Sequence, residues 1–255
     1  GRILQDNCAG LGLCKKDRLE PSSSMPNVAS FDDAETPFRP MFWRLTAETH
    51  ARHRNPLFGP TTGISLQNLS IDWLHTLSLG VCQFFLMHLV WDLITLNCYA
   101  IPGSFQNKFE LTVGRLRADL WAFYASEQAL GKMHTRVQQL LPAMFGTNGD
   151  RAFKLHGSET NGFLHFAVQL LVARGQVLGT KLQPYIRGVA ALVSILKCIK
   201  EHPRRLPPVA MQGFVDSVCM HMQACRSLGL SSKPKHHFFI EMAGRLSVCQ
   251  TWEPS

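Results

Sequence analysis

From Ile71 onward, the apolar and polar positions of the chain follow a helical period and predict a series of helices. The first is expected over about 72–97, where apolar residues occupy nearly every face, before Pro102 and Gly103 stop it. A helix that is apolar nearly all round is typical of a protein core. We therefore expect this segment to be a long buried helix.

Six further helices are expected from caps and apolar stripes. Ser104 is a favourable N-cap for a helix with an apolar stripe from Phe105 to Phe123. Ser126 is expected to cap another, with an inner face formed by Leu130, Met133, Val137, Leu140, Leu141 and Met144. The last four are expected at 158–175, from Pro184 to just before Pro203, from Pro208 to Gly229, and from Pro234.

Alternating strand patterns are scarce, so the fold class predicted is mainly α with few or no strands. Residues 1–40 are weakly patterned and are expected to form a loop-rich leader, followed by a single mainly helical domain over 41–255. Residue 1 is Gly, and no signal-peptide pattern follows it. We expect the chain to be a piece of a longer reading frame.

The apolar run at 77–100 is long enough to span a bilayer. Gln83, His88, Asp92 and Asn97 interrupt it, however, and no Lys or Arg flanks it closely. An aspartate at mid-membrane is costly. The pattern favours a buried core helix, and no membrane partner is expected.

The charge balance is basic, with 26 Lys and Arg against 18 Asp and Glu, or +8 at pH 7. Such a balance suits an anionic partner, although scattered basic residues more often form an ordinary solvated surface. Nucleic acid would be held through phosphate contacts by basic residues. The candidates for such contacts are Arg52, Arg54, Lys154, Arg204, Arg205, Lys233 and Lys235.

The eight cysteines include no CxxC pair, and most lie in apolar helical patterns, as is typical of reduced thiols in an intracellular protein. Of Cys219, His221 and Cys225, only the last two share a helix face, so core packing is favoured over a metal site. Glu48, His50 and His53 have ligand spacing but lie in a basic region, which disfavours a cation. No nucleotide-loop, hydrolase-elbow or zincin motif occurs.

Two acidic positions, each at the start of an expected helix, are candidates for a chemical role. Asp72 and His75 lie one turn apart at the head of the first expected helix, and Glu159 lies in the first turn of the helix at 158–175. Acidic residues are common at helix N-termini because they complement the helix dipole. Local physics alone favours that ordinary role for both.

A set of sequence blocks resembles a family of mobile-element-derived proteins. The blocks are His53-Arg-Asn-Pro-Leu-Phe58, Thr62-Gly63-Ile64, Asp72-Trp-Leu-His75 continuing to Leu79-Gly80-Val81, Val209–Asp216 and Lys233–Phe238. They resemble cut-and-paste DDE-type DNA transposases of the CACTA and related superfamilies, found in some protist genomes. The resemblance covers roughly 40–245. It implies the helical insertion and C-terminal helices of an RNase H-like (α/β) domain.

The resemblance implies a two-metal strand-transfer enzyme of the nucleus, using Mg²⁺ or Mn²⁺ in the full-length protein. Glu159 would be the third carboxylate and a metal ligand, and His75, with Asp72 beside it, would position the site. Lys154 stands five residues before Glu159, where the family pattern has three. Residues 1–70 contain only Asp6, Asp17, Asp32 and Asp33, none on a convincing strand.

Because one carboxylate cannot assemble a two-metal site, the chain alone is expected to be inactive and to need no metal cofactor. The alternative is a non-enzymatic, basic helical module that binds DNA or another protein. DNA is a possible partner, a homo-oligomer is compatible with the pattern, and neither a membrane partner nor a small-molecule substrate is inferred.

Overall fold

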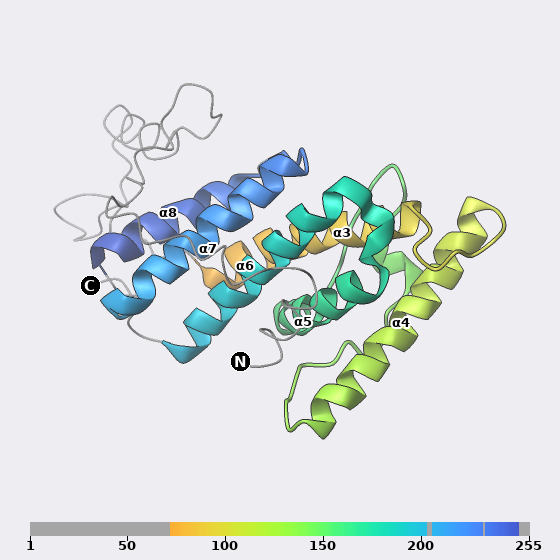
Figure 1. Cartoon of the computed structure of the whole chain (residues 1–255), viewed down its shortest axis with the longest axis horizontal. Helices are drawn as coiled ribbons and strands as arrows, with labels where there is room; N and C mark the ends of the chain where they lie inside the picture. Colours follow the sequence, from red (N-terminus) through yellow and green to blue (C-terminus); the bar gives the residue numbers. More distant parts are fainter. Residues whose placement is uncertain (1–71, 203–205, 232, 250–255) are drawn as a thin grey trace, which may run out of the picture. The chain divides into compact units, whose positions relative to one another are not determined.

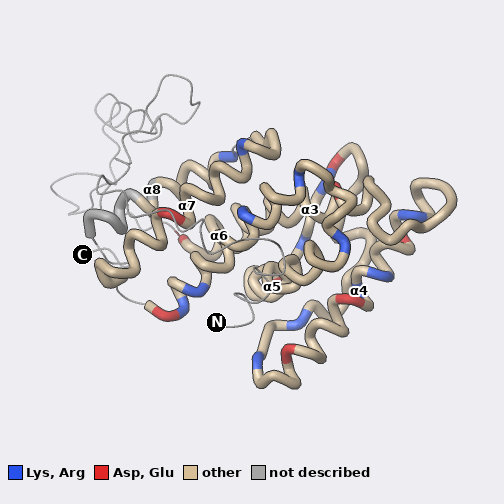
Figure 2. Tube along the Cα trace, viewed as in Figure 1, with Lys and Arg blue, Asp and Glu red and all other residues tan. Residues whose placement is uncertain are grey.

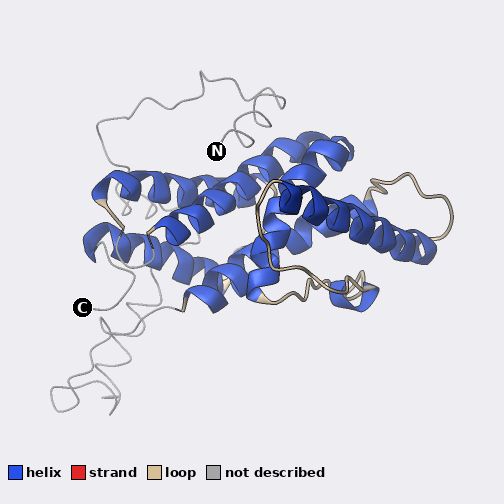
Figure 3. Cartoon of the chain, turned by 90° about the horizontal axis from the view of Figure 1, so that it is seen from below, coloured by secondary structure: helices blue, strands red, loops and turns tan. Residues whose placement is uncertain are grey.

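A computed structural model describes residues 72–202, 206–231 and 233–249 of the chain. These residues are mainly helical and include no strand (Figure 3), which confirms the mainly α prediction. All of the described helices belong to one compact unit of the chain. The expected leader, its boundary at residue 40 and the histidines at 50 and 53 lie outside the described residues.

The long helix expected over 72–97 is present as two continuous parts, η4 (Leu74–Cys82) and α3 (Gln83–Thr95). Its apolar side chains are buried as expected, and Phe85, Leu86 and Leu89 have no exposed surface. The first part has π-helical hydrogen bonding, which the apolar pattern did not predict. Together η4 and α3 form the central helix of the described unit (Figure 1).

The helix expected after Ser104 is also present, as α4 (Phe105–Ala129), and Ser104 Oγ accepts the Asn107 N–H as a cap. The separate helix expected from Ser126 was wrong, because α4 continues through that residue and Ser126 Oγ donates to Phe123 O within the helix. Gly131 then adopts a left-handed conformation (φ 73°), which ends the helical path.

After α4 the chain takes an irregular path to the short 3₁₀ helix η5 (Pro142–Phe145). Three residues of the expected inner face are exposed here, Leu130 by 58%, Met133 by 79% and Leu141 by 42%. Val137 and Leu140 are buried, and the Val137 N–H donates to the hydroxyl of Tyr124 on α4. The apolar spacing between 130 and 144 therefore reflects a loop packed at a few points, not a helix.

The remaining helices lie close to their expected positions. They are α5 (Gly157–Arg174), the 3₁₀ helix η6 (Gly175–Lys181), α6 (Leu182–Glu201), α7 (Pro208–Ser227) and α8 (Pro234–Cys249). The expected inner face of α7 is confirmed, since all five of its residues are buried: Met211, Val215, Val218, Met222 and Cys225.

Packing places the central helix between elements that are distant in sequence. α6 packs along α7, α7 contacts α8, and η4 contacts both α5 and α8. Lys181 and Tyr185 both donate to Asp92 Oδ2 at 2.9 Å, which ties α6 and the turn before it to α3.

Two helical stretches, Leu74–Thr95 and Gly157–Glu201, are long and apolar enough to cross a bilayer. In the first, 67% of the most apolar window is buried inside the fold, as a core helix would be.

Candidate nucleic-acid interface

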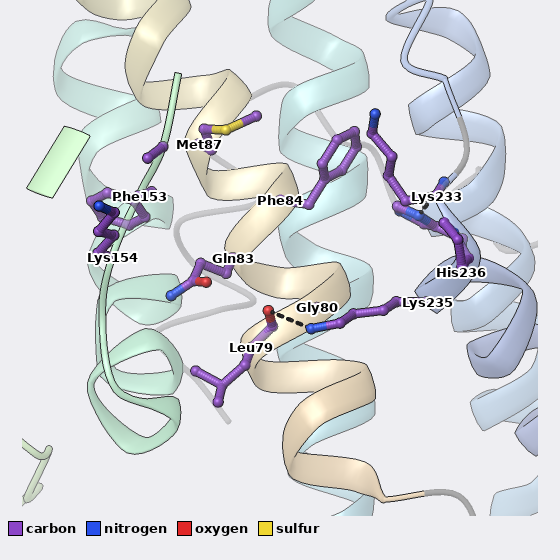
Figure 4. A pocket seen from close by; sticks show the side chains of 12 residues that line it. Leu79, Gly80, Gln83, Phe84, Met87, Phe153, Lys154, Lys233, Lys235 and His236 are labelled. Atoms are coloured by element: carbon purple, nitrogen blue, oxygen red, sulfur yellow. Dashed lines mark hydrogen bonds between the residues drawn. The ribbon is translucent and has the colours of Figure 1, made fainter. Parts of the chain in front are cut away.

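Three of the lysines selected from sequence line one groove on the central helix. Lys154 precedes α5, whereas Lys233 and Lys235 lie at the start of α8. The groove has a volume of about 450 Å³, and Figure 4 shows Lys154 on one side of the central helix and the other two lysines on the opposite side. All three side chains are exposed. Helix packing therefore joins basic residues that are some 80 positions apart in the sequence.

The start of α8 lies close to η4. Lys235 Nζ donates to Leu79 O at 3.3 Å, and Lys233 Nζ lies 6.0 Å from the ring centroid of Phe84. A Cβ atom on Gly80 would be 2.5 Å from Lys235 Cδ and 2.9 Å from a backbone oxygen of η4. Glycine at this position lets the lysine stem cross the helix at short range.

The groove is positively charged. The described residues that line it include three lysines and no carboxylate. Figure 2 shows that lysine and arginine also occur on several other described helices, so basic residues alone do not single out the groove. Its lining differs from that of two other pockets on the described surface, which include Glu159 and Asp119 respectively. A concave basic surface without acidic residues suits phosphate oxygens, which lysine binds as a point charge.

A second pocket, of about 660 Å³, adjoins the groove. Gln83 and Lys154 line both, and Arg136 and Glu159 line only the second. Among the described residues lining this pocket, Glu159 is the only carboxylate. Its neighbours therefore make the second pocket basic as well.

Glu159 has a clear local role. Its Oε2 accepts the His156 N–H at 2.9 Å, and this bond closes the first turn of α5. The sequence suggested Ser158 as the cap of this helix, but α5 begins at Gly157 with His156 as the N-cap. Glu159 therefore has the ordinary role that is expected of an acidic residue in the first turn of a helix, which is to stabilise the helix N-terminus.

Asp72 and His75 form a similar arrangement at the head of the central helix. Asp72 Oδ1 accepts the N–H groups of Leu74 and His75 at 2.8 and 3.3 Å, and Oδ2 lies 2.5 Å from His75 Nδ1. The side-chain hydrogen bond from His75 holds the pKa of Asp72 below its usual value. Both side chains are exposed.

The helix start at Asp72 and His75 packs next to the start of α5. A Cβ atom on Gly157 would lie 2.2 Å from Leu74 Cδ1, so a larger residue here would require the end of the Leu74 side chain to move. Leu74 stands between Asp72 and His75 in the sequence, and Gly157 stands two residues before Glu159. The structure therefore brings together the two helix starts that carry the acidic residues singled out from sequence.

These residues do not fit a pair of divalent cations. Mg²⁺ and Mn²⁺ are held by several oxygen ligands, usually including more than one carboxylate at a two-metal site. The pocket of Glu159 offers one carboxylate, beside Arg136 and Lys154. We therefore derive no metal-dependent step from the described residues.

The other basic residues selected from sequence, Arg52, Arg54, Arg204 and Arg205, lie outside the described residues. The sequence patterns did not single out Gln83, which lines both pockets, or Arg136, which lines the second. Gln83 was visible as a polar interruption of an apolar helix. Arg136 could not be selected from the sequence. The segment around it was expected to form a helix, whereas the structure shows a loop that places Arg136 at the second pocket.

No model of a known protein family, no curated protein and no solved structure matches this chain. Its function is therefore inferred from its own residues.

Proposed function

We propose that this chain is the helical part of a transposase-like DNA-processing protein and that its basic groove holds the DNA backbone. The observation that carries the proposal is the convergence of Lys154, Lys233 and Lys235 on one groove lined by no carboxylate among the described residues. Each lysine that neutralises a phosphate releases condensed counterions, and this release drives binding to DNA.

The transposase-like part of the proposal rests on the sequence blocks and on where they lie. The Asp72–His75 block packs through Leu74 against Gly157, at the start of the helix that carries Glu159. The pocket of Glu159 shares Lys154 with the groove, so DNA held there would pass close to this carboxylate. In this proposal the described helices are the insertion and the C-terminal helices of an RNase H-like domain.

A non-enzymatic DNA-binding module is the second candidate. One observation favours this candidate: Glu159 is the sole carboxylate among the described residues lining its pocket, whereas a two-metal site usually needs more than one. Mn²⁺ binding tests whether Glu159 is a metal ligand, because Glu159→Ala lowers it only if Glu159 is one. Equal binding by the wild-type and variant chains would remove Glu159 as a ligand.

The DNA-binding proposal is tested by the salt dependence of binding to a fluorescent duplex, followed by anisotropy. The variant replaces the three groove lysines with alanine. Each phosphate contact contributes about 0.9 to the slope of log K against log salt, so the slope should fall by about 2.7 and affinity at 0.1 M salt by about 500-fold.

The matched control replaces three lysines outside the groove, Lys108, Lys197 and Lys200, and so has the same net charge. It should keep most of the wild-type slope. If the two triple variants lose affinity equally, the groove is not the binding surface. If the wild-type chain does not bind duplex at low salt, the proposal is wrong.

A further inference from the structure

A cluster of metal-binding side chains lies in the core behind the groove. His221 and Cys225 are one turn apart on α7, and His236 is in the first turn of α8. Each offers one ligand atom, and these atoms all lie within 4.8 Å of one another. The three residues are 0%, 4% and 1% exposed. Transition metals are often bound by imidazole and thiolate groups gathered in this way.

The orientation of His221 suits a ligand. Its Nδ1 lies 3.4 Å from Gly188 O on α6, and its Nε2 lies 3.5 Å from Cys225 Sγ. Donation from Nδ1 to the carbonyl leaves the lone pair of Nε2 directed at the thiol. Metal-binding histidines usually donate their second ring nitrogen to a carbonyl or carboxylate in this manner.

His236 supplies an independent observation. Its Nδ1 accepts the Lys233 N–H at 3.1 Å, but its Nε2 is buried and has no hydrogen-bond partner among the described residues. A buried polar atom without a partner is costly, and native proteins rarely leave one. The cluster therefore contains a nitrogen that lacks the interaction its burial requires.

We propose that His221, Cys225 and His236 bind one Zn²⁺ ion. Two imidazoles and one thiolate are common zinc ligands, and a water molecule can complete the four-coordinate shell. His236 also lines the basic groove, so the cluster lies next to this pocket. Zinc bonds of about 2.0–2.3 Å require ligand atoms roughly 3.3–3.7 Å apart, so the longest separation closes by up to about 1.5 Å.

Binding changes the protonation of two ligands. Burial raises the pKa of the Cys225 thiol to about 12, so the thiol keeps its proton without an ion. Zinc binding breaks the S–H bond, forms the Zn–S bond and releases that proton to solvent. His236 loses its Nε2 proton and gains one at Nδ1, so it stays neutral and gives up the hydrogen bond from the Lys233 N–H.

The site would fix the first turn of α8 to α7. Lys233 and Lys235 lie three residues and one residue before His236 in the sequence, and both line the groove. Zinc binding would therefore hold the two lysines in place from behind. The proposal does not depend on DNA binding, since the three ligands are in the core and bind zinc whether or not the groove binds phosphate.

The competing explanation is a metal-free cluster. The rings of His221 and His236 are nearly parallel, at 4°, and aromatic side chains surround them: Phe84, Phe85 and Phe239. Two neutral histidines and a thiol can pack in such a core without an ion. This explanation predicts no zinc binding and is an outcome of the experiment.

The first measurement uses the unmodified chain. Co²⁺ replaces Zn²⁺ at such sites and gives a thiolate-to-metal charge-transfer absorption when cysteine is a ligand. We expect this absorption to saturate at one equivalent of Co²⁺ and to disappear when Zn²⁺ is added. A chain that is folded by circular dichroism but shows no charge-transfer absorption overturns the proposal.

The variants assign the ligands by zinc competition against a chromophoric chelator. Cys225→Ser and His236→Ala should each lower the affinity by 10-fold or more. Cys219→Ser is the matched control for the thiol, because it lies on another face of α7 and outside the cluster. His237→Ala is the control for the imidazole. If Cys219→Ser removes the charge-transfer absorption and Cys225→Ser keeps it, the assignment is wrong.

Discussion

Lowering the pH from 7.0 to 5.5 in the presence of a chelator should destabilise the fold through two buried histidines. Burial lowers the pKa of His221 to about 3 and that of His236 to about 4. In the unfolded chain both groups titrate near 6.5. Between these values the unfolded state binds protons that the folded state does not, so stability falls as pH decreases.

The linkage relation gives the size of the effect. At pH 5.5, protonation stabilises the unfolded state by about 1.4 kcal/mol for each histidine, against about 0.2 kcal/mol at pH 7.0. The loss is therefore about 1.2 kcal/mol for each histidine and about 2.4 kcal/mol for the pair. Burial also lowers the pKa of His88 and of His165, which add losses of the same sign.

Urea unfolding followed by circular dichroism between pH 7.0 and 5.5 measures this loss. The variant His236→Gln isolates one histidine, and its pH-dependent loss should be smaller than that of the wild-type chain by about 1.2 kcal/mol. His156→Gln is the control, because an exposed side chain is hydrated in both states. A wild-type chain whose stability is constant over this range, or an unchanged slope in His236→Gln, would refute the reasoning.

Three further predictions concern single contacts, each measured by urea unfolding. Tyr185→Phe removes the 2.9 Å hydrogen bond to Asp92 and should cost about 1.5 kcal/mol; no loss would mean that water replaces the hydroxyl. Gly188→Ala places a Cβ 2.2 Å from Phe85 Cζ and should cost about 1–3 kcal/mol; a neutral effect would show that the ring can move. Glu159→Ala removes the acceptor at the start of α5 and should cost about 1 kcal/mol, without weakening duplex binding in the anisotropy assay. Weaker duplex binding would mean that the carboxylate also orders the basic pocket.

Helix position could be predicted where apolar period and caps agree. The five inward positions of α7 were all found from their spacing, because the helix packs on one side against α6 and α8 and so needs an apolar stripe. The loop after α4 was not found, because its apolar residues also fit a helical period. Leu130 and Met133 are exposed, and Gly131 ends the helix through its left-handed conformation.

The π-helical hydrogen bonding of η4 could not be predicted for a different reason. The hydrogen-bond register depends on backbone geometry, whereas the sequence pattern records only which faces are apolar. Gly80 and its neighbours in η4 are buried on several sides of the helix. The apolar positions therefore do not mark one face, and their spacing cannot distinguish π-helical from α-helical hydrogen bonding.

The candidate site also has features that the sequence shows and features that only tertiary packing creates. The lysines could be selected from sequence because they are basic and clustered, but their convergence depends on the contact between η4 and α8, some 150 residues apart. For the proposed zinc ligands, the helical period showed that His221 and Cys225 share a face. Their meeting with His236 is a product of tertiary packing and had no signal in the chain.

The groove and the proposed zinc site share the first turn of α8, through which binding at one could be coupled to binding at the other. In the metal-free state the Lys233 N–H is bonded to His236, and in the zinc-bound state that bond is given up. If the two states place Lys233 and Lys235 differently toward a phosphate, zinc changes the affinity for duplex DNA, and by reciprocity duplex changes the affinity for zinc by the same factor. A zinc affinity that is equal with and without saturating duplex would show that the lysines have the same positions in both states. The two sites would then be neighbours without energetic coupling.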